Sequence, residues 1–233
     1  MKSIIITGAG SGIGYDMVRL LCEQPNHQIL AIARDTAALQ LFVQNKEGDS
    51  LSNLHVFKCD VENPQEIDEL IHSIKEKFSC INYLVNNAGS LINKSFEQLT
   101  QKEFLKMYQV NVFSVIQIIQ GLLPILTNAH IVNISSIGGV QGAAKFSGLS
   151  GYSSSKAALA VLSECLAEEL KSKGIHVNCL ALGAVQTKML QAAFPNYIAP
   201  VTSLQMAAYI IDFTLTSANL FNGKIIPVGV TTP

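Results

Sequence analysis

The chain has 233 residues, of which 48% are hydrophobic and 14% are charged, and its formal net charge is −1. This composition allows a sizeable buried core and excludes a disordered chain. No block of like charge is present, so nothing favours a nucleic-acid partner or an anionic membrane surface.

The five cysteines and five histidines are scattered along the chain. They show the spacing of neither a zinc site nor a disulfide framework, so we expect no metal and a reducing environment. The N-terminus lacks the organisation of a signal peptide, and no uninterrupted apolar run is long enough to span a bilayer. We therefore expect a cytoplasmic protein without a membrane partner.

The first predicted elements are a buried strand over 3–6, a glycine-rich turn and a helix. The turn reads Thr7-Gly8-Ala9-Gly10-Ser11-Gly12-Ile13-Gly14. Glycines permit a tight turn and let backbone N–H groups approach a pyrophosphate, to which the helix N-terminus adds its partial positive charge. The spacing G-x-x-x-G-x-G differs from the common G-x-G-x-x-G. The strand–turn–helix context nevertheless predicts a dinucleotide site.

The second predicted strand, 28–33, ends in Arg34-Asp35. In dinucleotide-binding folds an acidic residue near this point binds the adenosine ribose, whereas an arginine accommodates a 2′-phosphate. Arg34, directly after Ala33, favours NADP(H) over NAD(H). Asp35 keeps NAD(H) open, because a shift of register would restore an acid.

The rest of the chain continues to alternate between strands and helices. Further strands are predicted at 54–59, 81–85, 130–134, 175–180 and 224–228. Further helices are predicted at 35–47, 64–78, 101–126, 152–171 and 202–216. The alternation predicts an α/β fold, a doubly wound parallel sheet of about seven strands with helices on both faces. We expect one domain, 1–233, in which the less regular segment 188–201 forms a substrate lid.

Tyr152 and Lys156 stand four residues apart at the start of a predicted helix, and so on one face of it. A free phenol has a pKa of about 10 and is a poor proton donor or acceptor at neutral pH. A nearby ammonium favours the phenolate, and about 4 kcal/mol of differential stabilisation would bring the pKa to about 7. The pair predicts an acid/base unit; the alternative is a surface tyrosine stacked on a lysine stem.

Taken together, these motifs resemble the short-chain dehydrogenase/reductase family over nearly the whole chain. The resemblance implies a Rossmann-like NAD(P)-binding fold and an enzyme that interconverts a carbonyl and an alcohol by hydride transfer. The residues that carry it are the glycine turn, Asp60-Val61, Asn86-Asn87-Ala88-Gly89, Asn111, Ser136, Tyr152-x-x-x-Lys156, and Gly183 with Thr187.

The resemblance also implies a role for each residue of a catalytic set. Tyr152 would be the general acid in reduction or the base in oxidation, and Ser136 would hydrogen-bond the substrate oxygen. Lys156 would bind the nicotinamide ribose and lower the pKa of Tyr152. Asn111 would hold a water that links Lys156 to solvent.

The cofactor site implied by the resemblance is larger. Asp60 would hydrogen-bond the adenine, Asn87 would lie near its ribose, and Thr187 would hold the nicotinamide carboxamide. The full set is Gly8, Ser11, Gly12, Ile13, Gly14, Arg34, Asp60, Val61, Asn87, Ala88, Gly89, Tyr152, Lys156, Gly183, Val185 and Thr187.

Three features depart from the family pattern. Leu182-Gly183 replaces the usual Pro-Gly, for which we expect little effect. The loop from Ser136 to Tyr152 is slightly longer than usual and borders the expected substrate site, where it could narrow specificity. The last strand runs into Val-Gly-Val over 228–230 in place of an acidic Asp-Gly-Gly, so contacts near the C-terminus are expected to differ.

We expect an NADP(H)-dependent enzyme that reduces a small-molecule ketone or aldehyde, or oxidises the secondary alcohol. Apolar side chains in the lid favour an apolar substrate, although they would serve equally to pack the lid onto the core; they are Met189, Leu190, Phe194, Tyr197 and Ile198. One alternative is a 3-oxoacyl thioester reductase acting on a carrier protein, for which no dense basic docking patch is seen. Another is a non-catalytic NADP(H)-binding regulator, which would not need the catalytic set.

The predicted helices at 101–126 and 152–171 carry more apolar surface than one sheet face requires. The family's corresponding helices commonly form a dimer interface. We therefore expect a homodimer or a homotetramer.

Overall fold

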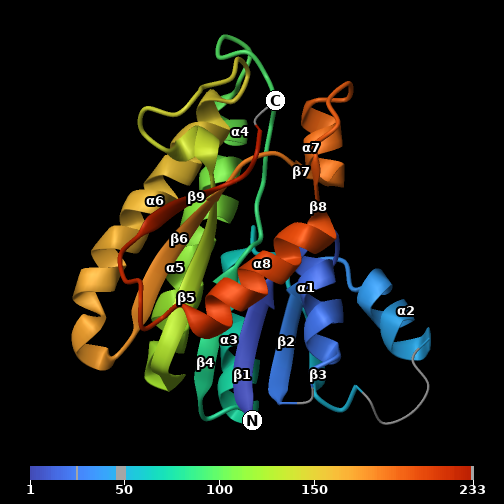
Figure 1. Ribbon diagram of the computed structural model, residues 1–233, viewed down its shortest axis with the longest axis vertical. Coiled ribbons are helices and arrows are strands. Elements are labelled where there is room, and N and C mark those ends of the chain that lie inside the picture. Colours follow the sequence, from blue (N-terminus) through green and yellow to red (C-terminus); the bar gives the residue numbers. More distant parts are fainter. Residues whose placement is uncertain (25, 46–50, 232–233) are drawn as a thin grey trace.

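The computed structural model describes residues 1–24, 26–45 and 51–231, and within them the chain forms a central sheet between two layers of helices (Figure 1). Seven strands of this described part pair in parallel in the order β3-β2-β1-β4-β5-β6-β9. They are β1 (Lys2–Thr7), β2 (His27–Ala33), β3 (Leu54–Lys58), β4 (Ile81–Asn86), β5 (Leu126–Ser136), β6 (His176–Leu182) and β9 (Ile225–Val228). The predicted fold class is confirmed.

The strands are apolar because both faces of the sheet are covered. In β1, Ile4, Ile5 and Ile6 are fully buried, and they belong to two different core clusters, one on each face. Successive side chains of a strand point to opposite faces, so a strand between two helix layers needs a continuous apolar run. The chain order reverses between β1 and β4, which opens a crevice at the carboxyl ends of these strands.

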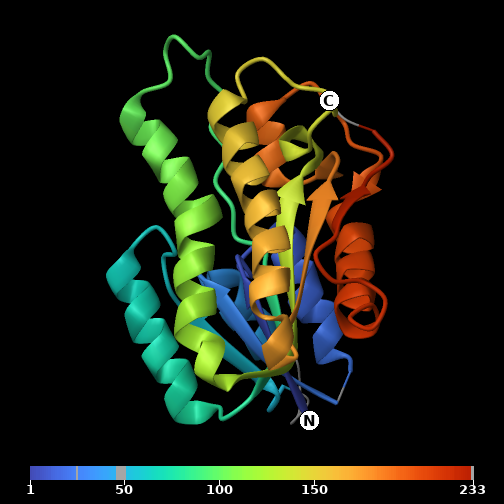
Figure 2. The same ribbon diagram turned by 90° about the vertical axis from the view of Figure 1, so that its left-hand side faces the viewer.

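Each face of the sheet is covered by its own set of helices. Helices α3 (Pro64–Lys77), α5 (Ser114–Leu122) and α6 (Ser150–Glu169) pack on one face, and α1 (Gly12–Cys22) and α8 (Ser203–Thr216) pack on the other (Figure 2). Helix α2 (Ala37–Asn45) lies at the β3 end of the sheet (Figure 1).

The helix predicted over 101–126 is interrupted. The structure has α4 (Gln101–Tyr108), a π-helical turn (Gln109–Phe113), α5 and a short 3₁₀ turn (Leu123–Ile125). By length and composition alone the stretch Gln101–Ile125 is sufficient to cross a membrane, so the expectation that no such run exists is wrong. This is weak evidence for a membrane span, because the same stretch packs into the core on the α3 and α6 side.

The segment after β6 contains structure that periodicity did not predict. Strands β7 (Val185–Gln186) and β8 (Val201–Thr202) form a second, two-stranded parallel sheet, and α7 (Lys188–Ala193) lies between them. Residues 187–200 therefore leave the body of the fold and return to nearly the same place. Figure 1 shows α7 at the same end of the molecule as the carboxyl ends of the main strands.

Candidate active site

A cavity of about 850 Å³ lies at the carboxyl ends of the strands. Its wall includes Arg34, directly after β2, and Ser136, at the end of β5. These two strands are separated by β1 and β4, and three strand spacings amount to roughly 14 Å. The cavity is thus elongated, and it joins the glycine turn to the predicted catalytic residues.

The glycine turn is fastened to the end of β4 by Thr7. The Thr7 hydroxyl accepts hydrogen bonds from the backbone N–H groups of Asn87 and Ala88, both at 3.0 Å. The Asn87 side chain in turn donates to the Thr7 carbonyl at 3.0 Å. Thr7 is buried, with 2% of its surface exposed. Asn87 therefore braces the turn, and Thr7 is a site residue that the sequence analysis did not assign.

Gly14 has a different position from the one predicted for it. It does not line the cavity; a methyl group added there would lie 2.2 Å from the Gly8 carbonyl oxygen and 2.7 Å from Asn87 Nδ2. Glycine is required at this position because α1 begins in direct contact with the turn. The side of the turn that faces the cavity is formed by Gly8, Gly10, Ser11, Gly12 and Ile13.

Charged groups meet at the β2 end of the cavity. Arg34 Nη1 lies 3.7 Å from Asp60 Oδ2, and 71% of the Arg34 side chain is exposed, so this pair contributes little to stability. Asp35 Oδ1 accepts a hydrogen bond from the Ala37 backbone N–H at the start of α2. Asp60 Oδ1 accepts from the Glu62 backbone N–H. Of these three side chains, only Arg34 keeps its charged group largely in solvent with no backbone partner.

Tyr152 stands in the first turn of α6 and faces Ser136 at the end of β5. Burial raises the pKa of the Tyr152 phenol, and a hydrogen bond with the Ser136 side chain partly offsets that rise. The Ser136 hydroxyl also accepts a hydrogen bond from the Gly138 backbone N–H at 3.2 Å. The phenol is therefore protonated at neutral pH in this arrangement, as a proton donor must be.

Lys156 lies one turn further along α6 and is almost fully buried. Its Nζ donates to the Ile134 carbonyl at 2.7 Å and lies 6.0 Å from the centre of the Tyr152 ring. Burial lowers the pKa of Lys156 to about 8. The expected lowering of the Tyr152 pKa by Lys156 is not seen here: burial raises that pKa, and the Ser136 hydrogen bond is what partly offsets the rise.

Asn111 lies in the π-helical turn and is fully buried. Its side chain accepts from the Ser90 backbone N–H and donates to the Ser90 carbonyl and the Ser155 hydroxyl, at 2.8 to 2.9 Å. A methyl group added at Gly89 would lie 3.5 Å from both Asn111 Oδ1 and Lys156 Nζ, so the three residues meet at one point. Asn111 does not line the cavity, and its visible role is to fix the turn after β4 beside Lys156.

The remaining predicted residues lie after β6. Gly183 and Val185 line the cavity between β6 and the excursion, and Thr187 caps α7 by accepting from the Leu190 backbone N–H. A methyl group added at Gly12 would lie 3.6 Å from the Thr187 methyl, so α7 begins opposite the glycine turn. The predicted residues not yet placed, Val61, Ala88 and Gly89, also line the cavity.

The fold and the cavity together define a dinucleotide-binding α/β oxidoreductase site, with a glycine turn at one end and a serine, a tyrosine and a lysine at the other. Sequence comparison assigns the family: the pattern described as short chain dehydrogenase matches residues 2–198, and the chain belongs to this family. It is therefore an NAD(P)-dependent oxidoreductase that acts on CH–OH or C=O groups, as predicted.

Two relatives illustrate the similarity. An uncharacterised oxidoreductase of Staphylococcus aureus (strain MW2) is 31% identical over 198 residues, which cover 84% of this chain and 83% of the relative. A fatty acyl-CoA reductase of Acinetobacter baylyi is 29% identical over 222 residues, which cover 92% of this chain and 72% of the relative.

Solved structures share the fold. A 4-hydroxyisoleucine dehydrogenase complexed with NADH superposes with a TM-score of 0.85 at 22% identity, over 99% of this chain and 98% of that one. A short chain dehydrogenase from Burkholderia cenocepacia in complex with NADP gives a TM-score of 0.86 at 23% identity, over 99% and 97%. These structures contain different cofactors, and at this identity they support the fold alone.

Proposed function

We propose that the protein is an NADP(H)-dependent reductase of ketones or aldehydes, with Tyr152 as the general acid. The main support for this proposal is that Ser136, Tyr152 and Lys156 line the same cavity of about 850 Å³ as the glycine turn. A protonated phenol beside a serine hydroxyl is the arrangement that a carbonyl oxygen needs as it gains charge and then a proton.

The glycine turn fits a dinucleotide. Gly8 and Gly12 have φ of 69° and 56°, and a methyl group at Gly12 would project into the gap before Thr187. Ser11, Gly12 and Ile13 at the start of α1 line the cavity, and the backbone N–H groups of a helix N-terminus suit a pyrophosphate. Gly183, Val185 and Thr187 would hold the nicotinamide end, and Asp60, Val61 and the 87–89 turn the adenosine end.

The chemistry that the cofactor supplies when bound is hydride transfer. Ser136 would donate a hydrogen bond to the substrate oxygen, and Tyr152 would give that oxygen its proton from the phenol. Lys156 would hold the nicotinamide ribose with its ammonium, and then favour the phenolate that remains. Asn111 would hold a water beside Lys156 through which Tyr152 regains a proton. In the reverse direction Tyr152 would be the base.

The preference for NADP(H) rests on Arg34. Its guanidinium is largely exposed at the β2 end of the cavity, whereas the Asp35 carboxylate caps α2. A 2′-phosphate would therefore meet an exposed guanidinium held only by its long contact with Asp60, and a ribose hydroxyl would find the Asp35 carboxylate already engaged.

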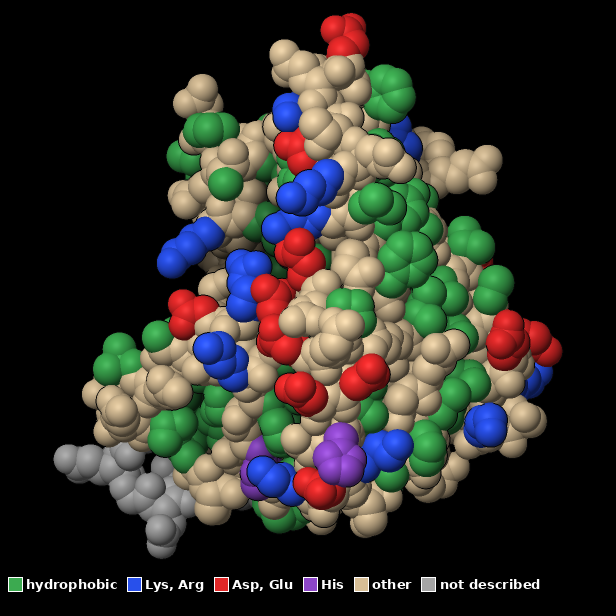
Figure 3. Space-filling model, turned by 180° about the vertical axis from the view of Figure 1, so that it is seen from behind, with side chains coloured by type: hydrophobic (Ala, Val, Ile, Leu, Met, Phe, Trp, Pro, Cys, Tyr) green, Lys and Arg blue, Asp and Glu red, His purple; other side chains and the backbone are tan. Residues whose placement is uncertain are grey.

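The same proposal covers the organisation of the chain. We propose one domain, 1–233, with residues 188–201 as the substrate lid, in a cytoplasmic homodimer or homotetramer. Hydrophobic side chains gather on the side formed by α4 and α5 (Figure 3), where Leu105 and Phe113 are 57% and 47% exposed; Val161 of α6 is 56% exposed. Analytical ultracentrifugation tests this assembly, and a monomer at micromolar concentration would contradict it.

A panel of ketones, aldehydes and alcohols assayed with NADPH and NADH tests the proposed function. We expect NADPH oxidation with at least one carbonyl class and a higher kcat/KM for NADPH than for NADH. The name of the Acinetobacter relative is a reason to include acyl thioesters, both free and carrier-bound. Turnover restricted to carrier-bound 3-oxoacyl thioesters would favour that alternative. Tight NADPH binding without any turnover would favour a regulator.

A further inference from the structure

The two ends of the cavity differ in the side chains that line them. The charged side chains that line it at the nucleotide end are Arg34, Asp35, Asp60, Glu62 and Lys106, of which Lys106 and Glu62 pair at 2.9 Å. Beyond Tyr152, the wall carries apolar side chains instead: Leu91, Phe146, Leu149, Met189, Leu190 and Phe194.

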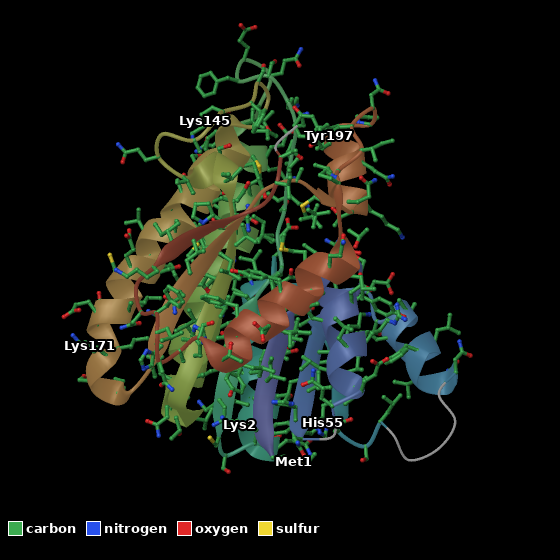
Figure 4. All side chains as sticks on the ribbon, viewed as in Figure 1. Met1, Lys2, His55, Lys145, Lys171 and Tyr197 are labelled. Atoms are coloured by element: carbon green, nitrogen blue, oxygen red, sulfur yellow. The ribbon has the colours of Figure 1, made fainter. Side chains whose placement is uncertain are left out.

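Two of these apolar side chains meet across the cavity. Phe146, from the loop between β5 and α6, and Phe194, directly after α7, form an edge-to-face contact with ring centroids 6.3 Å apart and planes at 73°. Both rings line the cavity and both are half-buried. Figure 4 shows Lys145 and Tyr197, which neighbour this aromatic pair in sequence, at the end of the molecule opposite Met1 and Lys2.

Asn93 holds the two segments that carry the aromatic pair. Its Nδ2 donates to the Ala193 carbonyl at 2.7 Å, next to Phe194. Its Oδ1 packs against Gly148, where a methyl group would lie 2.0 Å away, and the Lys94 backbone N–H donates to the Gly148 carbonyl at 3.0 Å. The segment 90–94 thus ties the lid to the loop before α6, and the positions of both phenylalanines are fixed before any substrate binds.

The charged side chains near the aromatic pair either form hydrogen bonds with the backbone or lie away from the two rings. Lys145 Nζ donates to the carbonyls of Val140 and Ala143 and does not line the cavity. Lys188, the first residue of α7, also lines the cavity, but its side chain is exposed and it follows Thr187, which faces the glycine turn. Among the residues that the structure describes, Lys156 is the lysine or arginine that is buried. Its Nζ lies near the site of the reacting carbonyl and already donates a hydrogen bond to the Ile134 carbonyl.

We infer that Phe146 and Phe194 determine substrate specificity by closing the far end of the cavity with an apolar, uncharged wall. The substrates are aldehydes or ketones whose group beside the carbonyl is aromatic or aliphatic and carries no charge. A carboxylate at that end would lose its hydration without gaining a cation, which costs far more than a hydrocarbon of the same size gains. This inference rests on the proposed function.

Benzaldehyde and 4-carboxybenzaldehyde test it, because they share one reacting group and differ by a single carboxylate. We expect the wild-type protein to prefer benzaldehyde by about 100-fold in kcat/KM, with NADPH held saturating. Phe194→Ala and Phe146→Ala should each lower kcat/KM for benzaldehyde about tenfold and leave the Kd for NADPH, followed by its fluorescence, unchanged.

Phe194→Lys should raise kcat/KM for 4-carboxybenzaldehyde at least about tenfold, since it adds the missing cation. The matched control is Phe96→Ala, which alters a phenylalanine that is 74% exposed on the neighbouring loop and does not line this cavity. Equal use of both aldehydes by the wild-type protein, or an unchanged ratio in Phe194→Ala, would overturn the inference.

Ligand-observed NMR with NADP⁺ and benzyl alcohol or 4-carboxybenzyl alcohol separates this inference from the proposed function. Selective binding of benzyl alcohol that is lost in Phe194→Ala, without turnover of any carbonyl, would refute the proposed function and retain the aromatic wall. Turnover of charged and uncharged aldehydes alike would do the reverse.

Discussion

The nucleotide end and the substrate end of the cavity are built in different ways. The nucleotide end is formed where β1, β2 and β4 stop, and the buried Thr7 hydroxyl there accepts hydrogen bonds from the backbone N–H groups of Asn87 and Ala88. The substrate end is formed by the loop before α6 and by the excursion around α7, and side-chain contacts of Asn93 and of the aromatic pair hold it together.

Because of this difference, substitutions at the two ends of the cavity should have different consequences. A change at the nucleotide end alters a strand terminus and affects folding, because buried N–H groups lose their acceptors. A change at the substrate end alters a loop wall and leaves the sheet intact. Ser136 and Tyr152 lie between the two ends, on β5 and α6, and so belong to the rigid part.

Tyr152→Phe should produce the largest effect. It removes the proton donor without changing the ring, so kcat/KM for carbonyl reduction should fall by about 10³-fold. The Kd for NADPH and the melting temperature should stay near their wild-type values. Tyr209→Phe is the control, because Tyr209 lies on α8 and is 40% exposed. Steady-state kinetics check the prediction, and a loss below tenfold would remove Tyr152 from its assigned role.

Arg34→Asp should change the cofactor preference. Loss of the cation and gain of an acid should shift the NADPH/NADH ratio of kcat/KM towards NADH by about 100-fold, since a charge-assisted contact is worth roughly 1.5–3 kcal/mol. Arg19→Asp is a matched control: its guanidinium also lies 3.7 Å from an aspartate, and its side chain is 49% exposed on α1. A wild-type protein that already prefers NADH would contradict the preference for NADP(H).

Thr7→Val should destabilise the fold and weaken cofactor binding together. The isosteric change leaves two backbone N–H groups, those of Asn87 and Ala88, without their acceptor, at a cost of about 2 kcal/mol. Thr214→Val is the control, because the buried Thr214 hydroxyl donates to a carbonyl within its own helix. Urea unfolding monitors stability; equal losses in the two variants would argue against the bracing role of Thr7.

Lys156→Met should abolish activity and yet raise the free energy of unfolding, by an amount that depends on pH. Burial lowers the pKa of Lys156 from 10.5 to about 8, so below pH 8 the folded protein bears the full cost of a buried ammonium. Between pH 8 and 10.5 the unfolded chain holds this proton and the folded chain releases it, so the cost disappears as the pH rises.

The variant should therefore be inactive, and at pH 7 its free energy of unfolding should exceed that of the wild-type protein by about 2 kcal/mol, after one lost hydrogen bond is counted. That advantage should shrink as the pH is raised from 8 to 10. Burial raises the pKa of Cys179 to about 11, above the pH range of this comparison, although Lys156 lowers it. A difference that is independent of pH would contradict the lowered pKa.

The sequence could predict which residues meet at the nucleotide end because this end depends on local patterns. Apolar runs that end in small or polar residues mark the strand termini, and the parallel order then brings Gly8, Asp60 and Asn87 to one edge. The roles within that edge were harder to predict. Gly14 was predicted as part of the cofactor site, whereas it packs the start of α1 against the turn and does not line the cavity. Asn87 lines the cavity as predicted and in addition braces the turn, which spacing along the chain could not show.

The substrate end could not be predicted in the same way. The strands β7 and β8 have two residues each, too few for any periodicity, and the contact between Phe146 and Phe194 joins positions that no repeat relates. The sequence around Asn111 has the apolar pattern of an ordinary helix, so the π-helical turn there was predicted as part of one continuous helix. The direction of the Tyr152 pKa shift could not be predicted either, because it depends on the burial of the phenol, which the sequence does not show.

The most direct test of the two-ended cavity is the double variant Arg34→Asp/Phe194→Ala, measured for cofactor preference and for benzaldehyde over 4-carboxybenzaldehyde. Arg34 and Phe194 lie at opposite ends of the cavity without shared partners, so changes at the two sites should act independently. Each preference in the double variant should therefore equal that of the corresponding single variant, to within about a factor of two to three. A coupling of more than about tenfold in either preference, or an Arg34→Asp effect on aldehyde choice, would contradict the division between a nucleotide end and a substrate end.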